Sequence, residues 1–295
     1  IQHAHTDPAV ELDVLILKFK DNQKKIKLEN ELNIVYAKIK QTLNHIAYKG
    51  AILDFQSILF KTLKEHSINI NDALSFKSLY QLTTIASISA FINKDYLKIE
   101  PFLINTYKSI LNYKNRDDQP YYHIQILYTI ANTLFRNKKF KESMRYLELM
   151  HEHMNLKKKK YYNTFKLKYH LLKSLNLNYS NQQELAIQAL EPLATKKHQD
   201  IESLLDINLS LIMFYFQKND LKKAHRKFSK FYHTDSWYTE KAGKEWVIKK
   251  NLVEILLHIE LQNIDLFESR LLSFKRAYYP YLKSINQKRV ITYLS

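Results

Sequence analysis

Apolar residues recur every three or four positions along most of this chain, which is the spacing of amphipathic helices. The pattern is clearest in the segment 127–150, LYTIANTLFRNKKFKESMRYLELM. One apolar stripe runs from Leu127 to Leu134 and a second from Phe140 to Met150, and four polar residues at 136–139 separate them. This pattern predicts a helix, a tight turn and a second helix. Because an isolated hairpin cannot bury both stripes, we expect similar hairpins on both sides of it.

The same spacing predicts helices along the rest of the chain, separated by polar or proline-containing connections. Besides the central hairpin, the expected helices span 10–19, 28–46, 51–63, 73–93, 95–111, 161–177, 185–193, 201–216, 221–232, 245–261, 266–279 and 284–294. The charged segment 21–27 predicts a break between the first two helices, and the segment 233–243 predicts a loop. Pro280 is expected to end or kink the helix before it.

The composition narrows the fold class. The 295 residues include 2 glycines and 5 prolines, which leaves little of the turn chemistry that β-hairpins, dinucleotide-binding folds and phosphate-binding loops need. We therefore predict an all-α protein with short connections. The chain has no cysteine, which excludes disulfides, thiol nucleophiles and cysteine-ligated metal sites.

The cellular setting follows from the same features. A chain without cysteine fits the reducing cytoplasm, where we expect the protein to reside. The longest strongly apolar run, 209–216, is too short to cross a bilayer, so we expect no membrane span. Because the first residue is Ile1 and not methionine, we expect the chain to be part of a longer protein.

Two segments of the chain align position by position. Residues 127–150 and 208–231 carry apolar or small residues at the same spacing. The second helices of successive hairpins also share a small residue, at Ser143, Ala186 and Ala224, with separations of 43 and 38 residues. Such self-similarity predicts a repeat architecture.

This pattern resembles the tetratricopeptide repeat, in which a large residue, a leucine and a small residue in the first helix precede a small residue in the second. Ala131 matches the small position of the first helix, and Ser143 and Ala224 match that of the second. The separations exceed the roughly 34 residues of the standard repeat, and Asn208 and Ile212 depart from its pattern. The resemblance implies a right-handed α-solenoid of antiparallel helix hairpins. We expect a single elongated helical-repeat domain over 1–295, with divergent hairpins in 1–115 and clearer repeats in 116–295.

In tetratricopeptide proteins the first helix of each hairpin lines a concave face that binds peptides, so the resemblance implies a peptide site. Carried over position by position, its residues are Tyr128, Asn132 and Phe135 in the central hairpin and Leu209, Met213 and Phe216 in the later one. The side-chain amide of Asn132 can hold an extended peptide backbone because it both donates and accepts hydrogen bonds. The alternative is an ordinary polar position on a helix.

The formal net charge of +17 and the isoelectric point near 9.6 predict attraction to anionic partners such as nucleic acid or the ribosome. The cations gather in two places, and a solvated helix face is the alternative interpretation of each. The first is Lys157, Lys158, Lys159 and Lys160, beside two tyrosines. The second is Lys222, Lys223, Arg226, Lys227 and Lys230, which we expect to share the outer surface of the helix 221–232 and to repel one another unless an anion covers them.

Both tryptophans of the chain, Trp237 and Trp246, flank the end of the predicted loop. Together with Tyr238 they indicate either a local packing anchor or an exposed lip that binds a partner.

The sequence contains no nucleophile elbow, phosphate-binding loop or His-Glu-x-x-His motif. We therefore expect no catalytic site, no metal site and no cofactor. Our first hypothesis is a non-catalytic scaffold of the tetratricopeptide type that binds a protein or peptide. One alternative is a basic helical-repeat factor associated with nucleic acid or the ribosome. Another is the peptide-sensing half of a transcription regulator, since irregular repeats of this kind are similar to those of such regulators.

Overall fold

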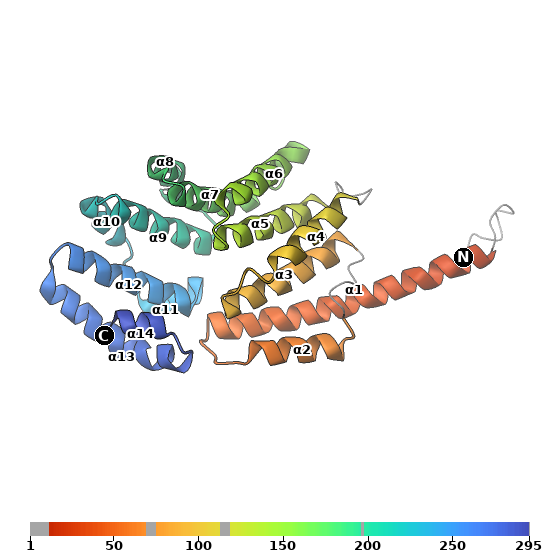
Figure 1. Ribbon diagram of the computed structural model, residues 1–295, viewed down its shortest axis with the longest axis horizontal. Coiled ribbons are helices and arrows are strands. Elements are labelled where there is room, and N and C mark those ends of the chain that lie inside the picture. The colour runs from red at the N-terminus through yellow and green to blue at the C-terminus, as the bar shows by residue number, and fades with distance from the viewer. Residues whose placement is uncertain (1–11, 69–74, 113–118, 196–197, 295) are drawn as a thin grey trace. The chain divides into compact units, whose positions relative to one another are not determined.

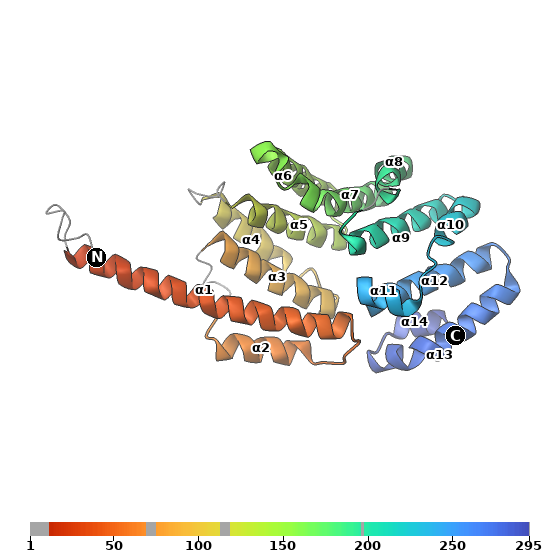
Figure 2. The ribbon, with the colours of Figure 1, turned by 180° about the vertical axis from the view of Figure 1, so that it is seen from behind.

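The computed structural model describes residues 12–68, 75–112, 119–195 and 198–294. The chain is 82% helical and the described residues contain no β-strand, which confirms the predicted all-α class (Figures 1 and 2). The helices are α1 Leu12–Ala47, α2 Phe55–Glu65, α3 Phe76–Asn93, α4 Glu100–Leu111, α5 Pro120–Arg136, α6 Phe140–Lys159, α7 Tyr162–Tyr179, α8 Gln183–Ala194, α9 Ile201–Gln217, α10 Leu221–Phe228, α11 Asp235–Ala242, α12 Lys244–Glu260, α13 Ile264–Ser284 and α14 Lys288–Tyr293.

The first helix, α1, is continuous over 36 residues, so the predicted break at 21–27 is wrong. The charged side chains of this stretch are exposed, where they suit a helix as well as a loop. Asp21 and Lys25 form an ion pair of 2.7 Å one helical turn apart, which supports the helix by about 0.3 kcal/mol. The sequence also has no glycine or proline between Pro8 and Gly50, so no residue type that stops helices lies in this stretch.

Near the C-terminal end, the predicted loop at 233–243 is wrong, and Pro280 does not end the helix that contains it. Most of the segment 233–243 forms the helix α11, because the Thr234 hydroxyl oxygen accepts a hydrogen bond from the backbone N–H of Trp237 and caps it. The helix α13 continues through Pro280 to its end at Ser284. Proline removes one backbone hydrogen bond there, but Tyr278 and Leu282 on either side are buried and their packing holds the helix together.

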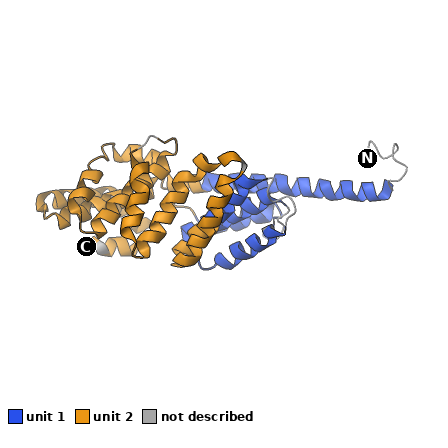
Figure 3. Cartoon of the chain, turned by 90° about the horizontal axis from the view of Figure 1, so that it is seen from above, with its two compact units in different colours: residues 1–42, 54–129 blue, residues 43–53, 130–295 orange. Residues whose placement is uncertain are grey.

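The chain divides into two compact units, residues 1–42 with 54–129 and residues 43–53 with 130–295 (Figure 3). In the first unit α3 packs against α2 and α4. The side-chain amide of Gln81 on α3 donates a hydrogen bond of 2.8 Å to Asn33 on α1. Val35 and Ile39 of α1 are fully buried in the same unit. A single elongated domain over 1–295, with a change of character at 115, stays a prediction.

Among the described helices, five consecutive pairs are joined by the same three-residue turn, which lies in the second unit each time. The pairs are α5 and α6, α7 and α8, α9 and α10, α12 and α13, and α13 and α14. The middle residue of each turn is left-handed, with φ of 61° at Lys138, 61° at Asn181, 60° at Asn219, 57° at Gln262 and 55° at Asn286. In each turn the next backbone N–H bonds at 2.9 Å to the carbonyl five residues before it, the hydrogen bond of a Schellman cap. The chain thus repeats one turn without glycine.

The position of the small residues repeats with the turn. Ser143, Ala186 and Ala224 each follow the left-handed residue of their hairpin by five positions, and each is 0% exposed. A small side chain lets the second helix approach its neighbours closely. Successive hairpins also pack alike, because α6 contacts α7, α8 contacts α9, and α7 contacts α9 directly. The second unit is therefore a repeat-like arrangement of adjacent helices.

A buried polar chain joins three helices of this unit. The hydroxyl of Ser143 on α6 donates to the carbonyl of Ala131 on α5 at 2.8 Å. The side-chain amide of Asn176 on α7 donates to the Ser143 hydroxyl at 3.0 Å. Ser143 and Asn176 are both 0% exposed, so each hydrogen bond replaces one to water that folding removes.

The only two glycines of the sequence lie against one another's segments. Gly243 has a φ of 87°, and a Cβ there would lie 3.0 Å from the carbonyl oxygen of Ala47. Gly50 has a φ of 64°, and a Cβ there would lie 2.8 Å from the side chain of Lys244. Glycine is required at Gly243, because a side chain would be strained at this φ and its Cβ would meet backbone. At Gly50 the neighbouring atoms belong to the flexible end of a lysine side chain, so the close approach alone does not demand glycine. The segment 43–53 is held to the start of α12 in this way.

Candidate ligand-binding site

The sequence-predicted peptide residues of the second unit occupy equivalent positions on the first helices of two hairpins. Asn132 on α5 and Met213 on α9 precede the left-handed turn residue by six positions, and Phe135 and Phe216 precede it by three. All four side chains are partly exposed. Leu209, in contrast, is buried at 8% exposure, so its predicted place on the binding surface is wrong.

Tyr128 lies on the part of α5 that belongs to the first unit, and its side chain is partly exposed. The aromatic ring of Phe135 already has neighbours, since its centroid lies 5.8 Å from that of Phe140 and 5.6 Å from that of Tyr179. Met213 and Phe216 rest with one side against the core. Leu175 on α7 and Leu256 on α12 occupy the position of Asn132 in their hairpins and are also partly exposed.

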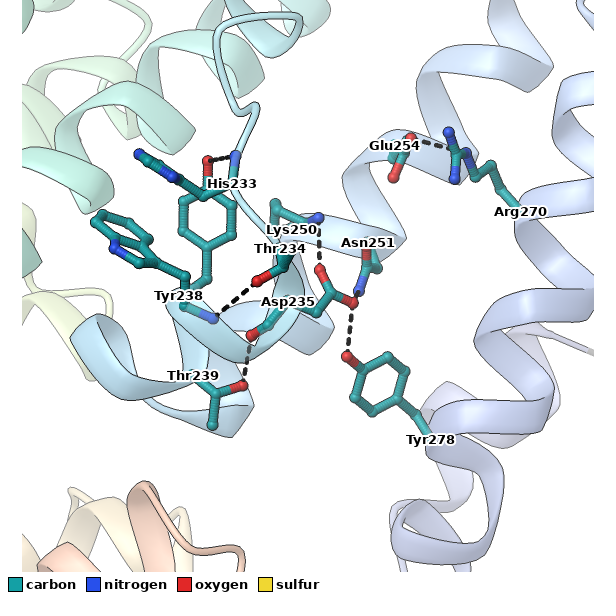
Figure 4. Close-up of polar contacts among 11 residues, drawn as sticks. His233, Thr234, Asp235, Tyr238, Thr239, Lys250, Asn251, Glu254, Arg270 and Tyr278 are labelled. Atoms are coloured by element: carbon teal, nitrogen blue, oxygen red, sulfur yellow. Dashed lines mark hydrogen bonds and ion pairs between the residues drawn. The ribbon is translucent and has the colours of Figure 1, made fainter.

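A cavity of about 330 Å³ lies elsewhere in the second unit, among α10, α11, α12 and α13 (Figure 4). Its volume falls at the lower end of the range of about 300 to 1,000 Å³ that is typical of small-molecule sites. It is lined by Phe228, Phe231, His233, Asp235, Lys250, Asn251, Glu254, Arg270, Ser273, Phe274, Ala277 and Tyr278.

Helical spacing brings these residues together. Lys250 and Glu254 are four residues apart and share one face of α12 with Asn251 between them. On α13, Arg270, Phe274 and Tyr278 recur every four residues and form a second wall. The third wall begins at Asp235, the first residue of α11, which the Thr234 cap holds in place.

Asp235 is the centre of the hydrogen bonds in this site (Figure 4). Its carboxylate accepts from the ammonium of Lys250 at 2.8 Å, from the amide of Asn251 at 2.7 Å and from the hydroxyl of Tyr278 at 2.7 Å. Burial alone would raise the pKa of Asp235, but these three donors outweigh it and hold the pKa below its usual value. Burial and the carboxylate also raise the pKa of Tyr278, so its hydroxyl remains a donor.

A second ion pair lies one helical turn along α12. Nε of Arg270 lies 3.0 Å from a carboxylate oxygen of Glu254, and the two side chains form an ion pair. The Glu254 side chain is 15% exposed, whereas that of Arg270 is 52% exposed. The guanidinium therefore stands at the mouth of the cavity and the carboxylate behind it.

Part of the predicted basic surface of α10 is neutralised within the chain. Lys227 is 13% exposed and pairs with Glu191 of α8 at 3.1 Å, so its expected place on the outer surface is wrong. Lys223 pairs with Asp220 at 2.9 Å. Burial would raise the pKa of Glu191, but hydrogen bonds from Tyr215 and Lys227 outweigh it and lower this pKa. Lys222, Arg226 and Lys230 are exposed as expected.

The other basic segment ends α6. Lys158, Lys159 and Lys160 are exposed, and the ammonium of Lys160 lies 5.3 Å from the ring centroid of Tyr161. The side chain of Lys157 lies outside the described residues.

The two tryptophans are explained mainly by packing. Tyr238 is 1% exposed and Trp246 is 5% exposed, and both belong to the core of the second unit. Trp237 is partly exposed and stacks on His233, with ring centroids 4.0 Å apart.

No family model matches this chain, and neither a curated protein nor a solved structure shows significant similarity to it. Within the described ranges, every helix is too short or too polar to traverse a lipid bilayer.

Proposed function

We propose that this chain is a non-catalytic scaffold that binds a protein or peptide, built from right-handed, tetratricopeptide-type hairpins. The observation that supports this proposal is the shared register of Asn132, Leu175, Met213 and Leu256, each six residues before the turn of its hairpin and each partly exposed. Repeated faces of this kind add up to an extended surface, which solenoid proteins use for binding.

The side chains at this register suit a peptide. Met213 and Phe216 expose part of an apolar side chain while the remainder rests on the core, so they can gain contacts without rearrangement. Methionine adapts to varied apolar partners because it is unbranched and flexible. Asn132 adds an amide that can pair with a peptide backbone.

The test uses peptides selected on the full chain from a random phage-displayed library, then synthesised with a fluorophore. Fluorescence anisotropy then compares the wild type with Met213→Gln and with Leu185→Gln. Leu185 is the matched control because it is 52% exposed on α8, a second helix. We expect Met213→Gln to weaken binding at least about tenfold, or roughly 1.4 kcal/mol, and Leu185→Gln to leave it unchanged. Equal binding by both variants would remove the proposed surface.

Asn132→Ala tests the amide separately. If the amide holds the peptide backbone, we expect this variant to weaken binding by roughly fivefold to tenfold, the effect of losing about one hydrogen bond. Unchanged affinity would show that Asn132 is an ordinary helix position.

A second candidate function, nucleic-acid or ribosome binding, is supported by the exposed Lys158, Lys159 and Lys160 beside Tyr161. Exposed cations next to an aromatic ring suit phosphate contact and base stacking. A filter-binding titration with RNA and DNA at low salt tests it, and affinity should fall steeply as salt rises. Absence of binding at low salt would dismiss this candidate.

A further inference from the structure

The cavity among α10 to α13 is separate from the proposed peptide surface that includes Met213. Its residues suit a different kind of ligand. Its apolar part consists of the rings of Phe228, Phe231 and Phe274. Phe274 is 3% exposed and forms part of the core, so this part of the wall is fixed before any ligand arrives. A rigid apolar wall suits an aromatic or branched aliphatic group of a small molecule.

The polar part of the cavity has hydrogen-bonding capacity to spare. Nε of Arg270 is the guanidinium nitrogen that pairs with Glu254, and the two terminal nitrogens have no hydrogen-bond partner among the described residues. Ser273 lies one turn further along α13, and its hydroxyl likewise has no partner within the described ranges. A guanidinium fork next to a hydroxyl is a favourable setting for a carboxylate.

The two carboxylates of the cavity, Asp235 and Glu254, differ in their remaining capacity to accept hydrogen bonds. Asp235 already accepts from three donors, whereas Glu254 has a single ion-pair partner among the described residues, Arg270. Each carboxylate has about four lone-pair positions. Glu254 therefore has the greater free capacity, and an ammonium group would find its acceptor there.

The cavity is also balanced in charge. Asp235 is paired with Lys250 and Glu254 with Arg270, so the two ion pairs sum to zero. A ligand with a net charge would leave one charge uncompensated in a partly buried site, which costs free energy. A ligand that carries one positive and one negative group keeps the balance and uses both free partners.

We propose that this cavity binds a free α-amino acid with an apolar side chain. Its carboxylate binds the terminal nitrogens of Arg270 and the hydroxyl of Ser273, its ammonium binds Glu254, and its side chain packs on Phe231 and Phe274. The repeat scaffold would thus carry a small-molecule site in addition to its peptide surface.

Isothermal titration calorimetry on the full chain tests the proposal with four probes. L-phenylalanine and L-leucine carry both charges, N-acetyl-L-phenylalanine lacks the ammonium, and L-phenylalaninamide lacks the carboxylate. We expect both amino acids to bind and both derivatives to bind at least about tenfold more weakly than phenylalanine. Absence of binding by either amino acid up to about 10 mM, or equal binding of a derivative, would overturn the proposal.

Two exposed arginines of α13 provide the variant and its control. Arg270→Met should weaken phenylalanine binding at least about tenfold. It should also abolish the preference of the protein for phenylalanine over phenylalaninamide. Arg276→Met removes a cation from the same helix outside the cavity and should change neither. Glu254→Gln should abolish the preference for phenylalanine over its N-acetyl derivative. Circular dichroism checks that each variant is folded, and unchanged binding in Arg270→Met would contradict the assignment.

Discussion

Replacing Asp235 by alanine tests the hydrogen-bond centre of the second unit. The change leaves the ammonium of Lys250, 8% exposed, without its carboxylate and removes the acceptor of Asn251 and Tyr278. Removing one partner of a buried ion pair costs about 3 to 5 kcal/mol. Because the Asp235 side chain is 40% exposed, solvent screens part of this interaction, and we expect a loss of about 2 kcal/mol.

The assay is urea unfolding followed by tryptophan fluorescence. Both tryptophans of the chain lie in α11 and α12, so the signal reports on this region. Asp265→Ala is the matched control, because Asp265 is an exposed carboxylate in the first turn of α13 and should matter by less than about 0.5 kcal/mol. Adding Lys250→Met to Asp235→Ala removes the unpaired cation and should recover about 1 kcal/mol. A loss below about 0.5 kcal/mol in Asp235→Ala would refute the reasoning.

The stability difference between the wild type and Asp235→Ala should also depend on pH. Folding lowers the pKa of Asp235, so its contribution is fully present above the unfolded pKa of about 3.9 and is lost as pH falls through the folded pKa. The stability difference between wild type and Asp235→Ala should therefore be constant from about pH 7 to pH 5 and shrink below about pH 4. A difference that shrinks already between pH 7 and pH 5 would contradict this.

Three further substitutions test the packing of the second unit by the same unfolding assay. Gly243→Ala should cost about 1 to 3 kcal/mol, because it places a Cβ 3.0 Å from the Ala47 carbonyl oxygen at a φ of 87°. A loss below about 0.5 kcal/mol would contradict that close approach. Ser143→Ala should cost about 1 to 3 kcal/mol, since it leaves the Ala131 carbonyl and the Asn176 amide short of a partner. A neutral result would show that these two hydrogen bonds contribute nothing to stability. Lys138→Gly should stabilise by up to about 1 kcal/mol by removing Cβ strain at a φ of 61°, and a marked loss would exclude the left-handed turn.

Apolar periodicity predicted most helices of this chain because an amphipathic stripe is a local property. The turn at 137–139 and the repeated small residues could be predicted for the same reason, since each depends on the local sequence. The small residues are Ser143, Ala186 and Ala224. The continuous α1 was missed because the charged residues at 21–27 are compatible with a solvated helix and with a break. The whole of α11 was missed because the segment 233–243 carries no apolar stripe, and the helix start depends on the hydrogen bond by which Thr234 caps it.

The site among α10 to α13 could not be predicted from local patterns. The partners of Asp235 lie 15, 16 and 43 residues further along the chain, so their convergence depends on how three helices pack. The spacing of Arg270, Phe274 and Tyr278 does place them on one helix face, but nothing in that pattern separates a cavity wall from a packed face. Likewise, the carboxylates that neutralise α10 include Glu191 on another helix.

The most direct measurement for the peptide surface is oxidative footprinting of two methionines with and without a selected peptide. Met213 lies on α9, the first helix of its hairpin, and Met144 lies on α6, the second helix of its hairpin. Both side chains are partly exposed. Mass spectrometry after brief peroxide treatment measures the oxidation rate of each sulfur. If the first helices of the hairpins bind the peptide, saturating peptide should slow the oxidation of Met213 by at least about threefold. The oxidation rate of Met144 should stay unchanged. Protection of Met144 alone, or of neither, would contradict the proposed surface.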